Sequence, residues 1–190
     1  MEAANNLGKV LVERKLHLVY GGGSLRLMGC VAIATHVGGS QDLGIIPTVL
    51  TVGNIIGKTI GEELQVSNMQ ERILKMLNNF DAFTALLGGY CTMEEIFQIT
   101  SWAQLNIHHK PIGLLNVNDF FNGLISFLDH VVEQKFISHS ARRILVFAST
   151  TDQLIDKLQA FAYEPDPVTT QIKWLMESSK KYRLDLTLRL

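Results

Sequence analysis

The residues best suited to chemistry lie near the centre of the chain, in the segment 87–95 (LGGYCTMEE), which follows an apolar run. Its two glycines allow close approach of backbone to a ligand, and the helical pattern behind them places free N–H groups at the same point. A second glycine loop, residues 21–24 (GGGS), follows another apolar run. Two such loops in one small domain predict binding of a phosphorylated metabolite.

Both loops also have simpler interpretations. The loop at 21–24 lacks the Gly-Lys-Ser/Thr of a Walker loop, and Arg26 stands where a dinucleotide fingerprint has its third glycine, which argues against ATP and NAD. A glycine cluster between a strand and a helix is also a common structural turn. Thr92 and Glu95 have the Thr-x-x-Glu spacing of a capping box, so Glu95 is either a helix cap or a functional carboxylate.

Charged residues in the predicted helix 69–79 leave a similar choice. Arg72 and Lys75 lie one turn apart, and Glu71 and Lys75 have the spacing of an i,i+4 ion pair on a solvated face. The adjacent histidines at 108–109 have no carboxylate at ligand spacing, so no metal site is predicted.

Apolar runs alternate with amphipathic segments along most of the chain. Helices are expected at 2–13, 25–37, 69–79, 92–107, 120–134 and 152–162, and strands at 16–20, 43–46, 63–66, 82–87, 111–117 and 144–148. This alternation predicts a parallel sheet with right-handed crossovers, and hence a Rossmann-like three-layer α/β/α sandwich with both glycine loops at the carboxyl ends of strands. We expect one domain over 1–163, an ordered loop over 48–61, and a loosely packed tail over 164–190.

Composition narrows the class of protein. The chain has 190 residues, of which 47% are hydrophobic and 18% charged, as is typical of a compact enzyme-like domain. Its net charge of −1 creates no field that favours nucleic acid or an anionic membrane. No membrane span, secretory signal or disulfide framework is evident, since Cys30 and Cys91 stand apart. We expect a soluble protein of the cytoplasm that is also present in the nucleus.

Three segments resemble plant members of the LONELY GUY (LOG) family: 20–29 (YGGGSLRLMG), 87–95, and 102–117 (WAQLNIHHKPIGLLNV). The likeness extends over most of the chain, from about residue 3 to about residue 174. It implies a cytokinin riboside 5'-monophosphate phosphoribohydrolase, which cleaves an N-glycosidic bond and releases free cytokinin and ribose 5-phosphate. The resemblance further implies a homodimer that uses no metal or redox cofactor. No lysine stands out as a Schiff-base partner for pyridoxal phosphate.

The resemblance also implies roles for individual residues. It makes Arg72 and Glu95 catalytic, because Glu95 would stabilise the ribose cation or orient water while Arg72 supports the phosphate or the leaving base. The residues expected to hold the phosphate are Gly21, Gly22, Gly23 and Ser24. The residues expected to contact substrate are Asn54, Ile73, Gly88, Gly89, Tyr90, Cys91, Thr92, Met93, Glu94 and Ser101. By helical spacing alone, Glu94 faces solvent.

Several features depart from the family pattern. Leu87 replaces a proline and Cys91 replaces a glycine, where a positive φ would strain the cysteine by roughly 1–2 kcal/mol. Ile73 replaces a lysine and Asn54 a glutamate. The sequence also starts inside the first helix, so the first strand of the sheet is expected to be missing, which predicts two half-sheets that pair directly or expose edges. The alternatives are therefore an impaired homologue that keeps the fold and dimer surface, and a general purine nucleotide hydrolase.

Overall fold

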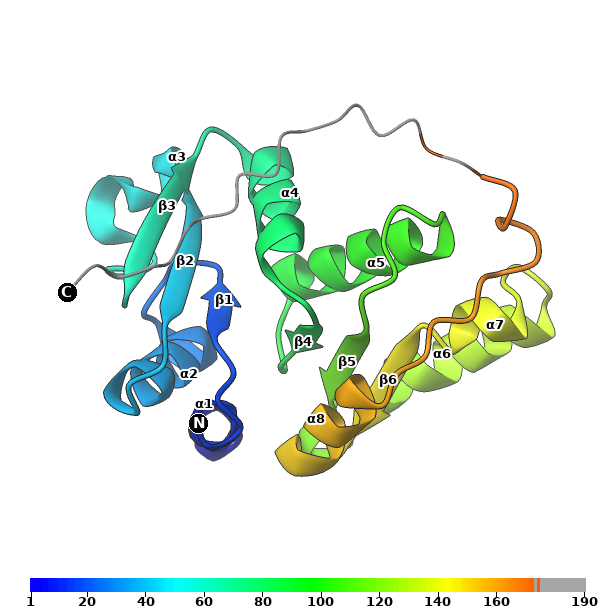
Figure 1. Ribbon diagram of the computed structural model, residues 1–190, viewed down its shortest axis with the longest axis horizontal. Coiled ribbons are helices and arrows are strands. Elements are labelled where there is room, and N and C mark those ends of the chain that lie inside the picture. The colour runs from blue at the N-terminus through cyan, green and yellow to red at the C-terminus, as the bar shows by residue number, and fades with distance from the viewer. Residues whose placement is uncertain (173, 175–190) are drawn as a thin grey trace.

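The computed structural model describes residues 1–172 and 174. Strands and helices alternate along this part of the chain (Figure 1). The strands are β1 (Leu18–Tyr20), β2 (Asp42–Pro47), β3 (Glu62–Val66), β4 (Phe83–Ala85), β5 (Ile112–Leu115) and β6 (Leu145–Ala148). The helices are α1 (Glu2–Glu13), α2 (Arg26–Val37), α3 (Thr48–Thr51), η1 (Val52–Asn54), α4 (Met69–Asn79), α5 (Tyr90–Gln104), η2 (Val117–Asp119), α6 (Asn122–Glu133), α7 (His139–Arg142) and α8 (Thr151–Gln159).

All strand pairs are parallel, and they form two separate sheets with the orders β1-β2-β3 and β4-β5-β6. Within the described residues, β1 pairs with β2 alone and β4 with β5 alone, and the two strands face each other across the middle of the molecule (Figure 1). The parallel α/β fold predicted from the alternation is confirmed. So is the expectation of two half-sheets with unpaired edges.

Helices cover both faces of the sheets. On one face, α1, α2 and α8 pack around a buried apolar cluster that includes Leu7, Val31 and Leu154. On the other face, α4, α5 and α7 contribute to a larger cluster that draws residues from both half-sheets, among them Ile45 of β2 and Leu114 of β5. The half-sheets are therefore joined by shared side-chain packing, although they share no backbone ladder.

The helices that the sequence did not predict are short. Residues 48–61, expected as a loop, contain α3 and η1, and the four-residue helix α7 was not predicted. A single turn shows no hydrophobic periodicity, so only its cap is visible in sequence. For α7 that cap is Ser138, whose Oγ accepts from Ala141 N at 3.0 Å.

The segment after α8 is better anchored than expected. Asp166 is buried, and Ser138 Oγ donates to Asp166 Oδ2 at 2.6 Å. Trp174 Nε1 donates to the Leu105 carbonyl at 2.7 Å. Residues 173 and 175–190 of the predicted tail lie outside the described residues.

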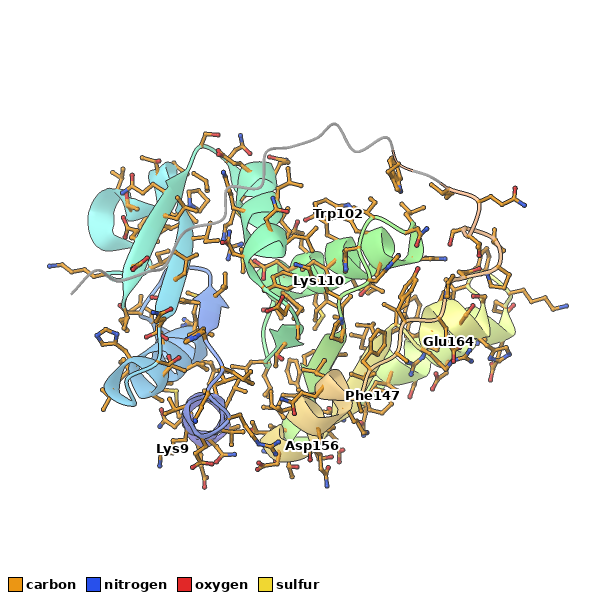
Figure 2. The ribbon with its side chains drawn as sticks, in the orientation of Figure 1. Lys9, Trp102, Lys110, Phe147, Asp156 and Glu164 are labelled. Atoms are coloured by element: carbon orange, nitrogen blue, oxygen red, sulfur yellow. The ribbon has the colours of Figure 1, made fainter. Side chains whose placement is uncertain are left out.

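The connection between α5 and β5 ties α4 to the rest of the fold. Lys110 Nζ donates to the carbonyls of Leu77, at 2.6 Å, and of Phe80, and it also lies 5.1 Å from the centre of the Phe80 ring. Figure 2 shows Lys110 between α4, α5 and β5. Burial lowers the pKa of this lysine. The ammonium thus holds the end of α4, the helix that carries Arg72.

His108, two residues earlier, is a buried part of the same connection. Its Nε2 lies 2.9 Å from the Ile99 carbonyl, and its Nδ1 accepts from Lys110 N at 3.2 Å. The neutral ring with its proton on Nε2 satisfies both contacts. Burial lowers the pKa of His108, because charging the ring would cost desolvation and place a proton against the Lys110 N–H.

We therefore expect acid to destabilise the fold through His108. Below its ordinary pKa of about 6.5 the unfolded chain takes up the proton before the folded chain does, so stability is lost as pH falls through the folded pKa. Urea unfolding of the protein at several pH values, compared with His108→Gln, should show a shallower acid loss in the variant. The neighbouring His109→Gln is the control, since His109 is exposed. Equal pH slopes in His108→Gln and the unaltered chain would contradict this role.

Candidate active site

The structure brings together the two residues predicted to be catalytic. Arg72 Nη1 of α4 donates to Glu95 Oε1 of α5, and Arg72 Nε donates to the Ile45 carbonyl of β2 at 3.2 Å. The side chains are only 12% and 16% exposed. The start of α4 is set by Asn68, whose side chain accepts from Glu71 N at 2.8 Å. Arg72 thereby lies in the first turn of its helix, near the carboxyl end of β2.

Gly21 is required for this arrangement. It directly follows β1, and a Cβ added there would overlap Arg72 Nη2 and lie 3.1 Å from Met28 Sδ. The absence of a side chain lets the guanidinium cross the end of β1. The carboxyl ends of β1 and β2 and the helix that follows β4 therefore meet at one ion pair.

The start of α5 offers an anion site beside the pair. The helix is capped by Gly89, and its first internal bond runs from Met93 N to the Gly89 carbonyl at 3.0 Å. The N–H groups of Tyr90, Cys91 and Thr92 precede that bond and point out of the helix end. With the helix dipole, they favour a phosphate group.

The capping-box interpretation of Thr92 and Glu95 is wrong. Thr92 is the third residue of α5 and Gly89 is the cap, so the helix begins three residues earlier than that pattern requires. Glu95 lies in the second turn and uses Oε1 to accept from Arg72. Its position supports the functional alternative.

The loop at 21–24 is packed more tightly than a free phosphate cradle. Ser24 N donates to the Ile56 carbonyl at 3.0 Å, and Gly22 and Gly23 are buried. The Tyr20 hydroxyl donates to the Ile60 carbonyl at 2.8 Å and accepts from Ile60 N at 2.7 Å. Burial raises the pKa of Tyr20, so the phenol keeps its proton. The phosphate role of Gly22, Gly23 and Ser24 stays a prediction, and the start of α5 is the more open anion site.

Some expected substrate contacts lie away from the ion pair. Ile73 is 2% exposed and belongs to the core cluster shared by the half-sheets, so it does not reach the site. It follows Arg72 directly, and neighbouring residues of a helix point about 100° apart. Ser101 is exposed and its Oγ donates to the Phe97 carbonyl at 2.7 Å.

Other expected contacts surround the start of α5. Tyr90 is 95% exposed, Cys91 and Glu94 are exposed, and Met93 packs partly against the core. Cys91 is not among the non-glycine residues with positive φ, so the expected backbone strain is absent. The side chain of Asn54, in η1, lies outside the description.

A groove of about 1350 Å³ opens beside the pair. It runs between β1 and β4 and reaches Arg72, Thr92 and Glu95 at one end. The sequence-based prediction of the site omitted two groups that lie beside the pair or line the groove. One is the Ile45 carbonyl, which leaves no signal in a sequence, and the other is Leu86, which is part of the predicted strand.

Within residues 1–172 no group of three or more His, Cys, Asp or Glu side chains gathers to hold a metal ion, and no helix is long and apolar enough to cross a membrane.

Comparison with known proteins identifies the family to which the chain belongs. Residues 28–158 match the family described as possible lysine decarboxylase. The probable cytokinin riboside 5'-monophosphate phosphoribohydrolase LOGL3 of Oryza sativa subsp. japonica is 49% identical over 173 residues, which are 91% of this chain and 82% of that protein. The cytokinin riboside 5'-monophosphate phosphoribohydrolase LOG3 of Arabidopsis thaliana is 48% identical over 176 residues, or 93% of this chain and 82% of that protein.

The X-ray structure of TM1055 is similar with a TM-score of 0.63, at 21% identity, over 84% of this chain and 87% of that one. Such a likeness bears on the fold alone, and it agrees with a Rossmann-like α/β protein that has helices on both faces of its strands. The sequence matches go further. The chain belongs to the LONELY GUY family, as its glycine segments indicate.

The glycines at the start of α5 provide a matched pair of variants. A Cβ on Gly88 would overlap Thr92 Oγ1 and lie 2.7 Å from Thr92 Cβ, so rotation of the Thr92 side chain cannot relieve it. A Cβ on Gly89 would meet nothing within 4 Å. We expect Gly88→Ala to lower the free energy of unfolding by about 1–3 kcal/mol, whereas Gly89→Ala lowers it by less than about 1 kcal/mol.

Urea denaturation of the two variants beside the unaltered chain measures this difference. Equal losses of stability would show that Thr92 does not pack over Gly88 as described.

Proposed function

We propose that this chain hydrolyses the N-glycosidic bond of a cytokinin riboside 5'-monophosphate, releasing the free cytokinin base and ribose 5-phosphate. The observation that carries the proposal is the Arg72–Glu95 ion pair beside the open start of α5. The names of relatives that are 48% and 49% identical supply the substrate class.

The phosphate anchors the substrate in this proposal. The N–H groups at the start of α5 take its oxygens, and Glu95 lies one turn further along the same helix, about 4.5 Å from Thr92 by helical rise. A phosphate held at the helix end therefore places the ribose over Glu95. Binding energy from this remote group serves to orient the bond that breaks.

The ion pair orients the carboxylate for the reaction. Arg72 engages Oε1, and Oε2 has no hydrogen bond among the described residues. In cleavage the ribose ring gains positive charge as the bond from C1' to the base nitrogen breaks. Glu95 stabilises this charge, and Oε2 accepts a hydrogen bond from the water that attacks C1'. As the bond from the water oxygen to C1' forms, the water loses one proton. The bonding electrons leave with the base, which takes up one proton in balance, while Arg72 fixes the carboxylate and contributes positive charge.

We also propose that the protein acts as a homodimer. The exposed apolar side chains of Met69 and Leu74 on α4 and of Tyr90 and Phe97 on α5 support an interface over these two helices. Such a surface is rare on a monomer when it is continuous. An interface there would border the proposed phosphate site.

The reaction is tested by replacing one carboxylate. Glu95→Gln should lower kcat for release of base from isopentenyladenosine 5'-monophosphate by at least about 100-fold, because the neutral amide no longer stabilises the ribose cation. Release of free base is followed by chromatography. A comparison with AMP distinguishes a general purine nucleotide hydrolase.

Glu94→Gln is the matched control, since Glu94 is the adjacent carboxylate on the same helix and is exposed. We expect its kcat to stay close to that of the unaltered chain, with any effect confined to KM. Unchanged turnover in Glu95→Gln would refute the assignment. If the unaltered chain releases no base from either nucleotide, it is the non-catalytic homologue instead.

The dimer is tested separately by light scattering after size-exclusion chromatography. The unaltered protein should have twice the 21.2 kDa mass of one chain. Phe97→Asp should shift it towards the monomer, because a charge would be buried in the interface. The control Phe136→Asp replaces another exposed phenylalanine, after α6, and should leave the mass unchanged. A monomeric unaltered protein would contradict the proposal.

A further inference from the structure

The carboxylate of Glu71 on α4 makes its bonds to a residue that precedes the helix. Its Oε2 accepts from Ser67 N at 2.8 Å and from Ser67 Oγ at 2.7 Å. These bonds lower the pKa of Glu71, because they stabilise its ionised form. The spacing of Glu71 and Lys75 predicted an ion pair on a solvated face, but no ion pair joins them in the part of the chain that the structure describes. Glu71 is engaged at the start of the helix instead.

The bonds of Glu71 complete a closed network before the first turn of α4. Asn68 Oδ1 accepts from Glu71 N at 2.8 Å, and Asn68 Nδ2 donates to Ser67 Oγ at 2.9 Å. In an ordinary capping box the third helical residue reaches back to the N–H of the cap. Glu71 reaches one residue further, to Ser67, which directly follows β3 (Figure 1). The carboxylate thus ties the first turn of α4 to the end of a strand.

That strand belongs to the half-sheet that also accepts a bond from Arg72. β3 pairs with β2, and Arg72 Nε donates to the Ile45 carbonyl of β2 at 3.2 Å. The first turn of α4 is therefore joined to one sheet at two points, Ser67 and Ile45. Two such points fix the rotation of the helix about its axis.

The rotation of α4 matters because Arg72 must also reach Glu95 of α5, which follows the other half-sheet. The guanidinium lies at the end of a long side chain, further from the helix axis than the Cα atoms at about 2.3 Å. A small rotation of α4 therefore moves the guanidinium more than it moves the backbone. Loss of the tie at Ser67 would leave Arg72 to hold the helix by itself.

We propose that Glu71 is a positioning residue for the reaction, which sets the rotation of α4 through Ser67 and so directs Arg72 to Glu95. Within the described residues its carboxylate bonds to Ser67 alone, so it acts through Arg72 and not on the substrate. The effect on catalysis rests on the proposed hydrolysis, whereas the effect on the position of Arg72 does not.

The position of Arg72 is measured without any reaction. Its Nε–H gives one resonance in a heteronuclear NMR spectrum, assigned by its loss in Arg72→Lys. The hydrogen bond to Ile45 slows exchange of this proton with water. Glu71→Ala should speed the exchange by about fivefold or more, because it releases the first turn of α4 from β3. Glu71→Gln should keep it within about twofold of the unaltered chain, since an amide oxygen accepts the same bonds.

Lys75→Ala is the matched control, because Lys75 is the partner that spacing alone assigns to Glu71. It should leave the exchange of the Arg72 proton and the rate of base release unchanged. An effect of Lys75→Ala equal to that of Glu71→Ala would mean that Glu71 acts through an ion pair, which overturns the proposal.

Kinetics then separates positioning from binding. Glu71→Ala should lower kcat for release of base from isopentenyladenosine 5'-monophosphate by about 5–20-fold and change KM by less than about twofold, because the N–H groups at the start of α5 stay in place. Glu71→Gln should restore kcat. Rates are divided by the folded fraction from urea unfolding, so that a loss of stability alone does not lower kcat.

Unchanged exchange of the Arg72 proton in Glu71→Ala overturns the proposal, as does altered exchange with an unchanged kcat in an active chain. Failure of Glu71→Gln to restore both quantities overturns it too. Failure of the proposed function is a different result: the unaltered chain then releases no base, or Glu95→Gln retains turnover. In that case faster exchange in Glu71→Ala alone still supports the role of Glu71 in holding Arg72, and equal exchange in all variants overturns it.

Discussion

The arrangement of the site depends on the hydrogen bonds that the guanidinium of Arg72 makes to Ile45 and Glu95. Arg72 belongs to α4, a helix that packs on the first half-sheet, and it donates to the Ile45 carbonyl of that sheet. It also pairs with Glu95 of α5, the helix that follows β4 of the second half-sheet. The five fixed donors of an arginine allow these contacts at once, which a lysine could not make. Gly21 leaves the space that the guanidinium occupies.

Other features support that one side chain. Asn68 caps α4 and so fixes the turn in which Arg72 lies, while Lys110 holds the carbonyls at the opposite end of the same helix. The apolar side chains of α4, among them Ile73 and Met76, bury it against residues of both half-sheets. The two half-sheets are thus connected by side-chain packing and not by backbone hydrogen bonds. Ile73 is a core residue, and its burial holds α4, and with it the adjacent Arg72, in place.

Sequence patterns predicted the fold more completely than the site. The helices 2–13 and 69–79 begin and end where expected, because their apolar periodicity is strong and their surroundings are simple. The start of α5 was misplaced, because Thr92 and Glu95 imitate a capping box. Family resemblance selected Arg72 and Glu95, but it also assigned substrate contact to Ile73, which is buried. A pattern of residue types does not record which face of a helix each side chain occupies.

The sequence by itself determined the class of the protein: an alternating α/β chain of the LONELY GUY family with two glycine loops after strands. Only the tertiary structure decided which of those residues meet. Arg72 and Glu95 are separated by 22 intervening residues and a strand, and their contact depends on how two half-sheets pack. It likewise decided that Gly22 and Gly23 are buried and that Ser24 bonds to Ile56, while the start of α5 is open. The reason is physical: local patterns set local structure, whereas hydrogen-bond partners across the molecule follow from packing.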